Sequence, residues 1–188
     1  MTRRAGFIAA ALGLALGGLA LAGAARADSL HLYSYDPADA PTRQAAGPLT
    51  FTFRKGLLHT TVLALMSTEA QATAYLRPAD DRALGRGGLP GVAGPESSRD
   101  RTLYEVRSAE EGAALISAFC PGAGRAWLAF GPLKLNRDLT VLVLGAPAAG
   151  GPARLCRTLA FRFHGEWLLP PGRAINPRDL EVHRYPGT

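Results

Sequence analysis

The sequence predicts a single α+β domain with a mainly antiparallel sheet of about six strands and one clear helix near residues 108–119. Short runs alternate apolar and polar residues, and a serine followed by a glutamate precedes one amphipathic run. The chain length also suits one hydrophobic core. An all-β sandwich with a helical insertion is the alternative, because most of the patterned segments have the period of strands.

Residues 1–27 have the pattern of a cleavable signal peptide. Arg3 and Arg4 precede an apolar run from Phe7 to Leu21, and Ala25-Arg26-Ala27 offers the small residues that a signal peptidase reads. We therefore expect a periplasmic or secreted protein with no stable membrane anchor after cleavage. The general secretory route is favoured over the twin-arginine route, which Arg3-Arg4 leaves open.

The first half of the expected domain, which covers residues 28–172, contains several strand patterns. Strands are expected at residues 29–35, 49–53 and 60–66, while residues 70–76 fit either a strand or a helix. Asp36-Pro37 fits an N-cap and a first helical residue, so a short helix or turn should follow.

Glycine and proline are dense at residues 85–98, which predicts a long loop with little regular structure. Loops of this length are usually functional or mobile, so this one is either a docking or lid segment or a mobile insertion.

The clearest helix begins at Ser108, with Glu111 placed three residues later as in a capping box. An apolar face then runs to Phe119, and Cys120-Pro121-Gly122 should end the helix.

Four further strands are expected after this helix, at residues 127–130, 139–144, 155–163 and 167–169. His164-Gly165 should form the turn between the last two strands. Residues 173–188 are expected to be an extended tail.

The charge of the chain argues against nucleic-acid binding. Removing Arg3, Arg4 and Arg26 from the 21 basic residues leaves 18 basic against 15 acidic residues, a net charge of +3. Because basic and acidic residues are interspersed, no continuous stripe for phosphates is present.

Cys120 and Cys156 are the only cysteines. An oxidising compartment favours their pairing, so we predict one structural disulfide. A redox or metal-binding pair is disfavoured because the C-x-x-C spacing is absent.

The chain contains no nucleophile elbow, zinc helix, phosphate-binding loop or calcium loop, and its four histidines lack metal-ligand spacing. His31, His164 and Glu166 are the candidate ligand or site residues. His31 is near the expected mature N-terminus, and His164 is beside a predicted turn and close to Glu166. Arg54-Lys55, at the end of a strand, fits either an anion site or charge that protects an exposed turn.

The segment from His31 to Asp39, followed by Leu49-Thr-Phe51-Thr-Phe53, resembles the opening of small periplasmic copper-resistance β-sandwich proteins. The resemblance implies a β-sandwich in which His31 helps to bind copper(II). Two features depart from it: His31 would be the fourth mature residue rather than the first, and the family's later Asp-x-His pair is absent.

The leading functional hypothesis is a non-enzymatic, disulfide-stapled periplasmic binding or interaction module, with an unidentified protein or envelope component as its partner. An envelope-directed hydrolase with a non-contiguous active site is the second hypothesis, and a copper-binding protein is the third. A pocket that joins His164, Glu166 and a hydroxyl would favour the hydrolase, whereas an apolar patch beside residues 85–98 would favour binding. No cofactor is predicted.

Overall fold

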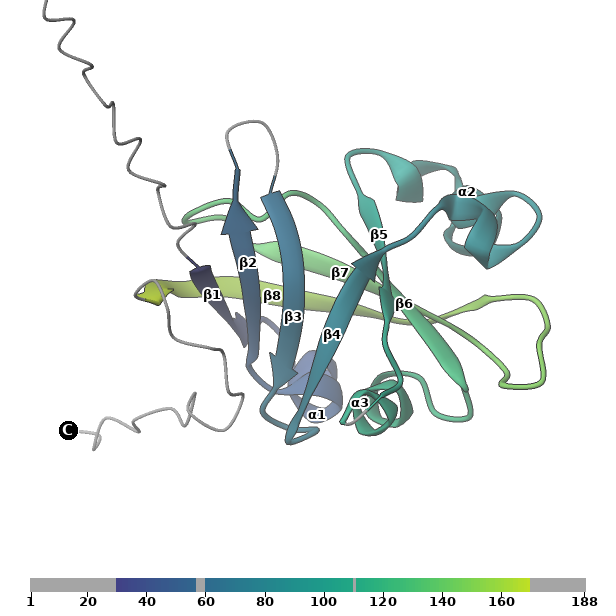
Figure 1. Ribbon diagram of the computed structural model, residues 1–188, viewed down its shortest axis with the longest axis horizontal. Helices are drawn as coiled ribbons and strands as arrows, with labels where there is room; N and C mark the ends of the chain where they lie inside the picture. The colour runs from purple at the N-terminus through teal and green to yellow at the C-terminus, as the bar shows by residue number, and fades with distance from the viewer. Residues whose placement is uncertain (1–29, 57–59, 110, 170–188) are drawn as a thin grey trace, which may run out of the picture.

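A computed structural model describes residues 30–56, 60–109 and 111–169, and these residues form eight strands in a closed antiparallel barrel (Figure 1). The strands are β1 (Leu30–Pro37), β2 (Leu49–Lys55), β3 (Thr60–Ser67), β4 (Ala72–Pro78), β5 (Thr102–Val106), β6 (Arg125–Phe130), β7 (Leu139–Ala146) and β8 (Arg154–Leu169). The predicted α+β domain, the sandwich alternative and the sandwich implied by the copper-resistance resemblance are therefore all wrong. The alternation of apolar residues identified most strands but does not distinguish an open sheet from a closed one.

The barrel closes through β8, which is 16 residues long. Its first half pairs with β7 and its second half pairs with β1. The predicted turn at His164-Gly165 is wrong, because the strand continues through a β-bulge there, with Ser34 opposite Gly165 and Tyr35 opposite Phe163. β5 was not expected at all.

The barrel interior is filled by side chains from alternate strand positions, as expected for a barrel of eight strands. β2 shows the pattern, since Leu49, Phe51 and Phe53 are fully buried in the core. The other large aromatic residues of this core include Tyr33, Tyr35, Tyr104, Phe130 and Phe161.

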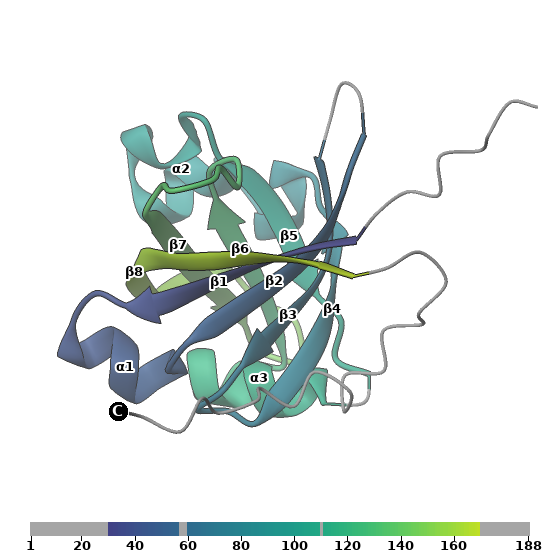
Figure 2. The same cartoon turned by 90° about the vertical axis from the view of Figure 1, so that its left-hand side faces the viewer.

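Two helices close one end of the barrel, which we call the lower end (Figures 1 and 2). α1 (Ala40–Ala46) connects β1 to β2 and begins after Asp39, whose carboxylate accepts a hydrogen bond from the Thr42 amide at 2.7 Å. The cap is thus Asp39 rather than the predicted Asp36, because β1 continues through Pro37.

The second of these helices, α3 (Gly112–Phe119), connects β5 to β6 and ends as predicted before Cys120. It begins later than Ser108, and the predicted capping box is absent: Glu111 accepts a hydrogen bond from the Thr73 amide of β4 instead. Leu115, Ile116 and Phe119 pack into the barrel core.

The connection between β4 and β5 packs on the outside of the barrel. It contains the short helices η1 (Asp81–Leu84), α2 (Gly88–Ala93) and η2 (Pro95–Ser98), so the prediction of a long irregular loop over 85–98 is wrong. Pro90 is tolerated in the first turn of α2, where backbone amides have no partner within the helix. Leu84 and Leu89 are buried in a second apolar cluster with Trp127, and this burial holds the segment in place.

The expected signal peptide at residues 1–27 and the expected tail at residues 173–188 lie outside the described residues. Export therefore remains an expectation from the sequence.

Candidate functional site

The opposite end of the barrel, which we call the upper end, gathers polar side chains from strands that are distant in sequence. β1 begins there and β2 and β8 end there, and the β4–β5 and β6–β7 connections leave and re-enter the barrel at the same end (Figure 1). Two of the predicted site residues meet at this end: His31 Nδ1 donates a hydrogen bond to Glu166 Oε1 at 2.8 Å.

Two further residues complete this group, which we call the mouth cluster: His31, Tyr33, Lys55 and Glu166. Lys55 Nζ donates to the Tyr33 hydroxyl at 3.0 Å and lies 3.4 Å from Glu166 Oε1. It also lies over the Tyr33 and Phe53 rings, 5.3 and 5.8 Å from their centroids. The cluster thus ties β1, β2 and β8 together over an aromatic floor.

The contacts in the mouth cluster stabilise its charged forms. The hydrogen bond from His31 and the charge of Lys55 lower the pKa of Glu166, against a smaller opposing effect of burial. Burial of Lys55 would lower its pKa, but the contacts with Tyr33 and Glu166 outweigh it and raise the pKa. At neutral pH the cluster therefore contains a carboxylate and an ammonium group held together.

His164, the third candidate, lies away from this cluster. Its Nδ1 donates to Asp36 Oδ2 at 2.7 Å, and its ring stacks on Trp167 with centroids 6.0 Å apart. The pocket that would have favoured the hydrolase, containing His164, Glu166 and a hydroxyl, is therefore not formed by the described residues.

Sequence reasoning did not select Tyr33, and it considered Lys55 only as part of a charged turn. A signal for both was present, because Tyr33 lies two residues from His31 and Lys55 lies two residues from Phe53, which places each pair on one face of its strand. Using that signal requires knowing that β1 lies between β2 and β8.

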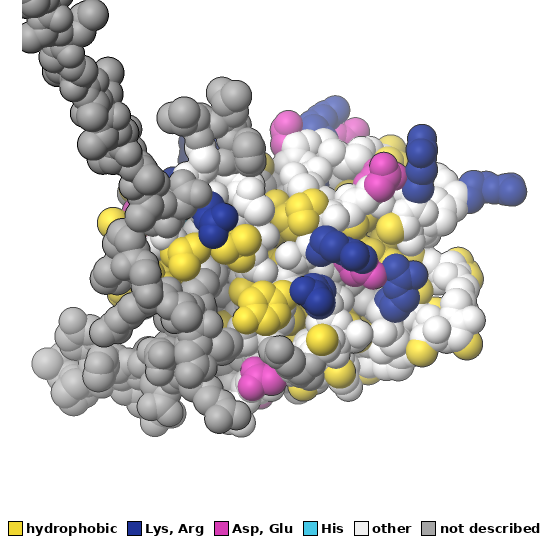
Figure 3. Space-filling model, in the orientation of Figure 1, with side chains coloured by type: hydrophobic (Ala, Val, Ile, Leu, Met, Phe, Trp, Pro, Cys, Tyr) yellow, Lys and Arg dark blue, Asp and Glu magenta, His cyan; other side chains and the backbone are white. Residues whose placement is uncertain are grey.

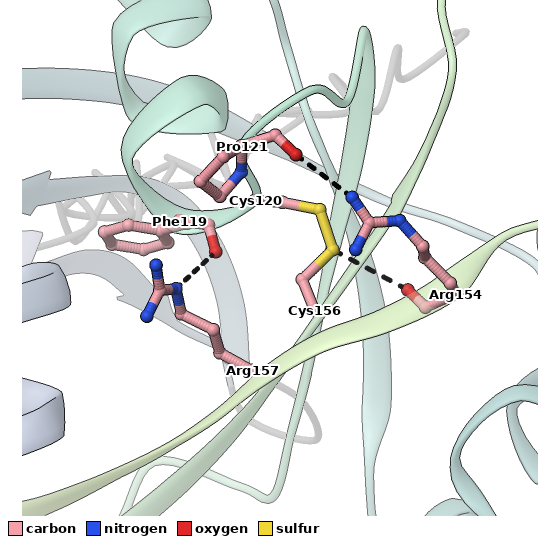
Figure 4. Close-up of a disulfide and its surroundings, with 6 residues drawn as sticks. All are labelled: Phe119, Cys120, Pro121, Arg154, Cys156 and Arg157. Carbon is pink, nitrogen blue, oxygen red and sulfur yellow. Dashed lines mark hydrogen bonds between the residues drawn. A yellow bond between two sulfur atoms is a disulfide. The ribbon is translucent and has the colours of Figure 1, made fainter.

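The predicted disulfide between Cys120 and Cys156 is present and joins the end of α3 to β8 (Figure 4). Arg157 Nε donates to the Phe119 carbonyl at 3.1 Å, and Arg154 Nη2 donates to the Pro121 carbonyl at 3.0 Å. These cations satisfy carbonyl groups at and just beyond the helix C-terminus, where positive charge is favourable. The surroundings of the Cys120–Cys156 pair are therefore those of a structural disulfide.

An open groove of about 430 Å³ lies at the upper end between the end of the 79–101 segment and the β6–β7 connection. It is lined by Arg99, Asp100, Arg101, Gly131, Pro132, Lys134, Arg137, Asp138, Leu139 and Thr140. The groove is beside the 85–98 segment, where an apolar patch would have favoured binding, but its lining is charged.

Elsewhere on the surface, basic side chains are interspersed with acidic ones. Glu105 accepts hydrogen bonds from both Arg77 and Arg125, and Figure 3 shows dark blue and magenta side chains together on this face of the barrel. Burial alone would raise the pKa of Glu105, but the hydrogen bonds and charges of Arg125 and Arg77 together outweigh it and lower the pKa.

Among the described residues, no group of three or more His, Cys, Asp or Glu side chains is arranged to hold a metal ion. In the same part of the chain, no helix has the length and apolar character needed to cross a membrane. His59 and His183 lie outside the described residues.

No protein-family model, curated protein or solved structure matches this chain.

Proposed function

We propose that this chain is an exported, non-enzymatic binding protein that takes an anionic ligand in the groove at the upper end of the barrel. The observation that carries the proposal is the state of the basic groups in that groove. Lys134 and Arg137 line it without an ion pair to any described residue. Two unpaired cations in one concave site are suited to a ligand that carries at least two negative charges.

Arg99 and Arg101, the other basic residues of the groove, differ in how strongly their existing contacts hold them. Arg99 forms an ion pair with Glu96 at 3.0 Å, but both side chains are highly exposed, so a stronger anionic ligand can replace Glu96 at little cost. Arg101 donates from Nη1 to the carbonyl oxygens of Glu96 and Ser97, which fixes the position of its charge at the edge of η2.

The acidic residues of the groove do not cancel this charge. Asp138 keeps its negative charge, and its Oδ1 accepts a hydrogen bond from the Phe163 amide at 3.1 Å. With four basic and two acidic side chains, the groove has a net positive lining.

The walls of the groove are anchored in the barrel, which lowers the entropy cost of binding. Leu133 packs into the barrel core from the β6–β7 connection, and the Asp138–Phe163 hydrogen bond ties the end of that connection to β8. On the opposite wall, Arg101 is held by η2 and is followed directly by β5.

The separation of His164 from Glu166 supports binding rather than hydrolysis, because the residues proposed for catalysis face different partners. Export is supported by the signal-peptide pattern of residues 1–27 and by the disulfide, which oxidising compartments favour.

The test is calorimetric titration of the protein with pyrophosphate and with citrate, which present phosphate and carboxylate charges respectively. We expect binding that weakens as salt is added, and loss of about tenfold or more in affinity when Lys134→Gln and Arg137→Gln are combined. The matched control combines Arg82→Gln and Arg86→Gln, which removes the same charge from exposed positions outside the groove. Equal weakening in both double variants, or no binding of either anion, would overturn the proposal.

A further inference from the structure

The outer face of β8 and β1 carries a second surface with the features of a ligand site, separate from the groove. We propose that this surface is a platform for a saccharide, with the indole of Trp167 as its base. Trp167 is 48% exposed, whereas the other tryptophan, Trp127, is only 1% exposed. A half-exposed indole on a sheet face offers a flat ring on which a ligand can stack.

The backbone of β8 leaves room for the indole of Trp167 to lie flat against the sheet. Gly165 lies two residues before Trp167, on the same face of β8, and a Cβ atom at Gly165 would be 3.0 Å from the indole ring. The absence of a side chain therefore lets the six-membered ring settle over the backbone. The exposed area of Trp167 is then the face that points away from the sheet.

The β-bulge in β8 brings a second ring to the same face. His164 and Trp167 are three residues apart and would point to opposite faces of a regular strand. The register shift at Ser34/Tyr35 inserts one extra residue in β8, and His164 consequently stacks on Trp167 with an interplanar angle of 13°. The hydrogen bond to Asp36 fixes the His164 ring at this place.

Polar groups surround the two rings. The His164 and Asp36 side chains are each more than half exposed. Ser34 lies opposite Gly165 on β1, and its hydroxyl forms a 2.8 Å hydrogen bond with the hydroxyl of Thr50 on β2. An imidazole, a carboxylate and two hydroxyls thus border an exposed indole.

This combination fits a pyranose ring better than an apolar ligand or a protein segment. A pyranose has one face of C–H groups, which carry partial positive charge and stack on the negative face of an indole. Its rim consists of hydroxyls, which both donate and accept hydrogen bonds and so match the polar groups around Trp167. The platform is an open sheet face, so it cannot enclose an apolar ligand. Leu32, which lies opposite Trp167 on β1, is buried and so offers little apolar surface to a protein partner.

The experiment uses the accessibility of Trp167 to acrylamide. In a Trp127→Phe variant, Trp167 is the only tryptophan, so fluorescence quenching reports on it alone. We expect cellotetraose, maltotetraose or chitotetraose at millimolar concentration to lower the quenching constant about twofold or more, because the sugar covers the exposed indole face. If Trp127→Phe does not fold, the shift of the Trp167 indole N–H signal in ¹⁵N-labelled wild-type protein gives the same readout.

Variants then locate the site. Gly165→Val, which lifts the indole, and His164→Ala should each weaken saccharide binding by about tenfold. Tyr75→Ala removes an exposed aromatic side chain from β4 and should leave binding unchanged. Two results would overturn the proposal: no protection of Trp167 by any of the three sugars, or protection that increases with protein concentration alone, which would assign the face to a second copy of the chain.

Discussion

His31 and Glu166 are 135 residues apart in the sequence, yet His31 Nδ1 and Glu166 Oε1 are only 2.8 Å apart. The contact exists because β1, the first strand, pairs with β8, the last, and so closes the barrel. Lys55, on β2, joins the same carboxylate. The mouth cluster therefore joins the strands whose pairing closes the barrel. Its removal should reduce the stability of the folded barrel.

Replacing Glu166 with Gln should reduce the free energy of unfolding by about 1 kcal/mol at neutral pH, since it removes two charge-assisted contacts at a partly exposed position. The folded state lowers the pKa of Glu166, so its contribution is present above the unfolded-state pKa and is lost as the pH falls through the folded-state pKa. Urea unfolding at about pH 7 and about pH 3 checks this.

The difference in the free energy of unfolding between wild type and Glu166→Gln should accordingly become smaller in acid. Glu96→Gln is the matched control, because Glu96 pairs with Arg99 at a highly exposed position, where such pairs contribute little. A difference that persists unchanged at about pH 3 would contradict the assigned role of the Glu166 carboxylate.

Tyr33 and Tyr35, on β1, should differ in how the loss of the hydroxyl changes the stability of the protein. The Tyr35 hydroxyl is buried without a hydrogen-bond partner among the described residues, and its burial, with the nearby Tyr33 and Asp138, raises its pKa. Tyr35→Phe should therefore leave stability unchanged or raise it by up to about 1 kcal/mol. Tyr33→Phe removes the acceptor of Lys55 and should cost about 1 kcal/mol.

Thermal and urea unfolding of the two variants side by side test this pair, since the change of volume is the same in both. A loss of stability in Tyr35→Phe equal to that in Tyr33→Phe would indicate that the Tyr35 hydroxyl has a partner after all.

The sequence predicted individual strands well where one face is buried. Phe51 and Phe53 predicted β2 because inward positions recur at every second residue of a strand. Closure could not be predicted in this way, because the same alternation suits a sheet, a sandwich and a barrel. It depends on the pairing of β1 with β8, which no local pattern records.

The candidate site was predicted in part for the same reason. His31 and Glu166 were both selected, but Gly165 suggested a turn that would have separated Glu166 from β1. A glycine within a strand can instead mark a bulge, and here it does. The groove was not predicted, because its basic residues come from two connections whose proximity depends on the barrel.

Gly145→Ala should destabilise the protein by about 2 kcal/mol or more, because β7 passes closely beneath the disulfide. A Cβ atom at Gly145 would lie 2.3 Å from Cys120 Sγ and 2.8 Å from the Ala123 Cβ, so the end of α3 would have to move. Gly131→Ala is the control, since its nearest contact is an ordinary one of 3.4 Å with the Asp100 carbonyl. Urea unfolding should separate the two variants clearly; equal stabilities would show that the segment after α3 can shift at little cost.

The disulfide closes a loop of 36 residues that includes β6 and β7, so its removal should be the largest single loss of stability among these variants. The chain-entropy model gives about 4 kcal/mol for a loop of this length. Combining Cys120→Ser with Cys156→Ser and measuring urea unfolding tests the value, and intact mass after alkylation, with and without reductant, shows whether the bond forms in the exported protein. The Arg157 and Arg154 contacts to the carbonyls of Phe119 and Pro121 do not need the bond. A double variant as stable as wild type would therefore mean that these cations alone hold α3 against β8.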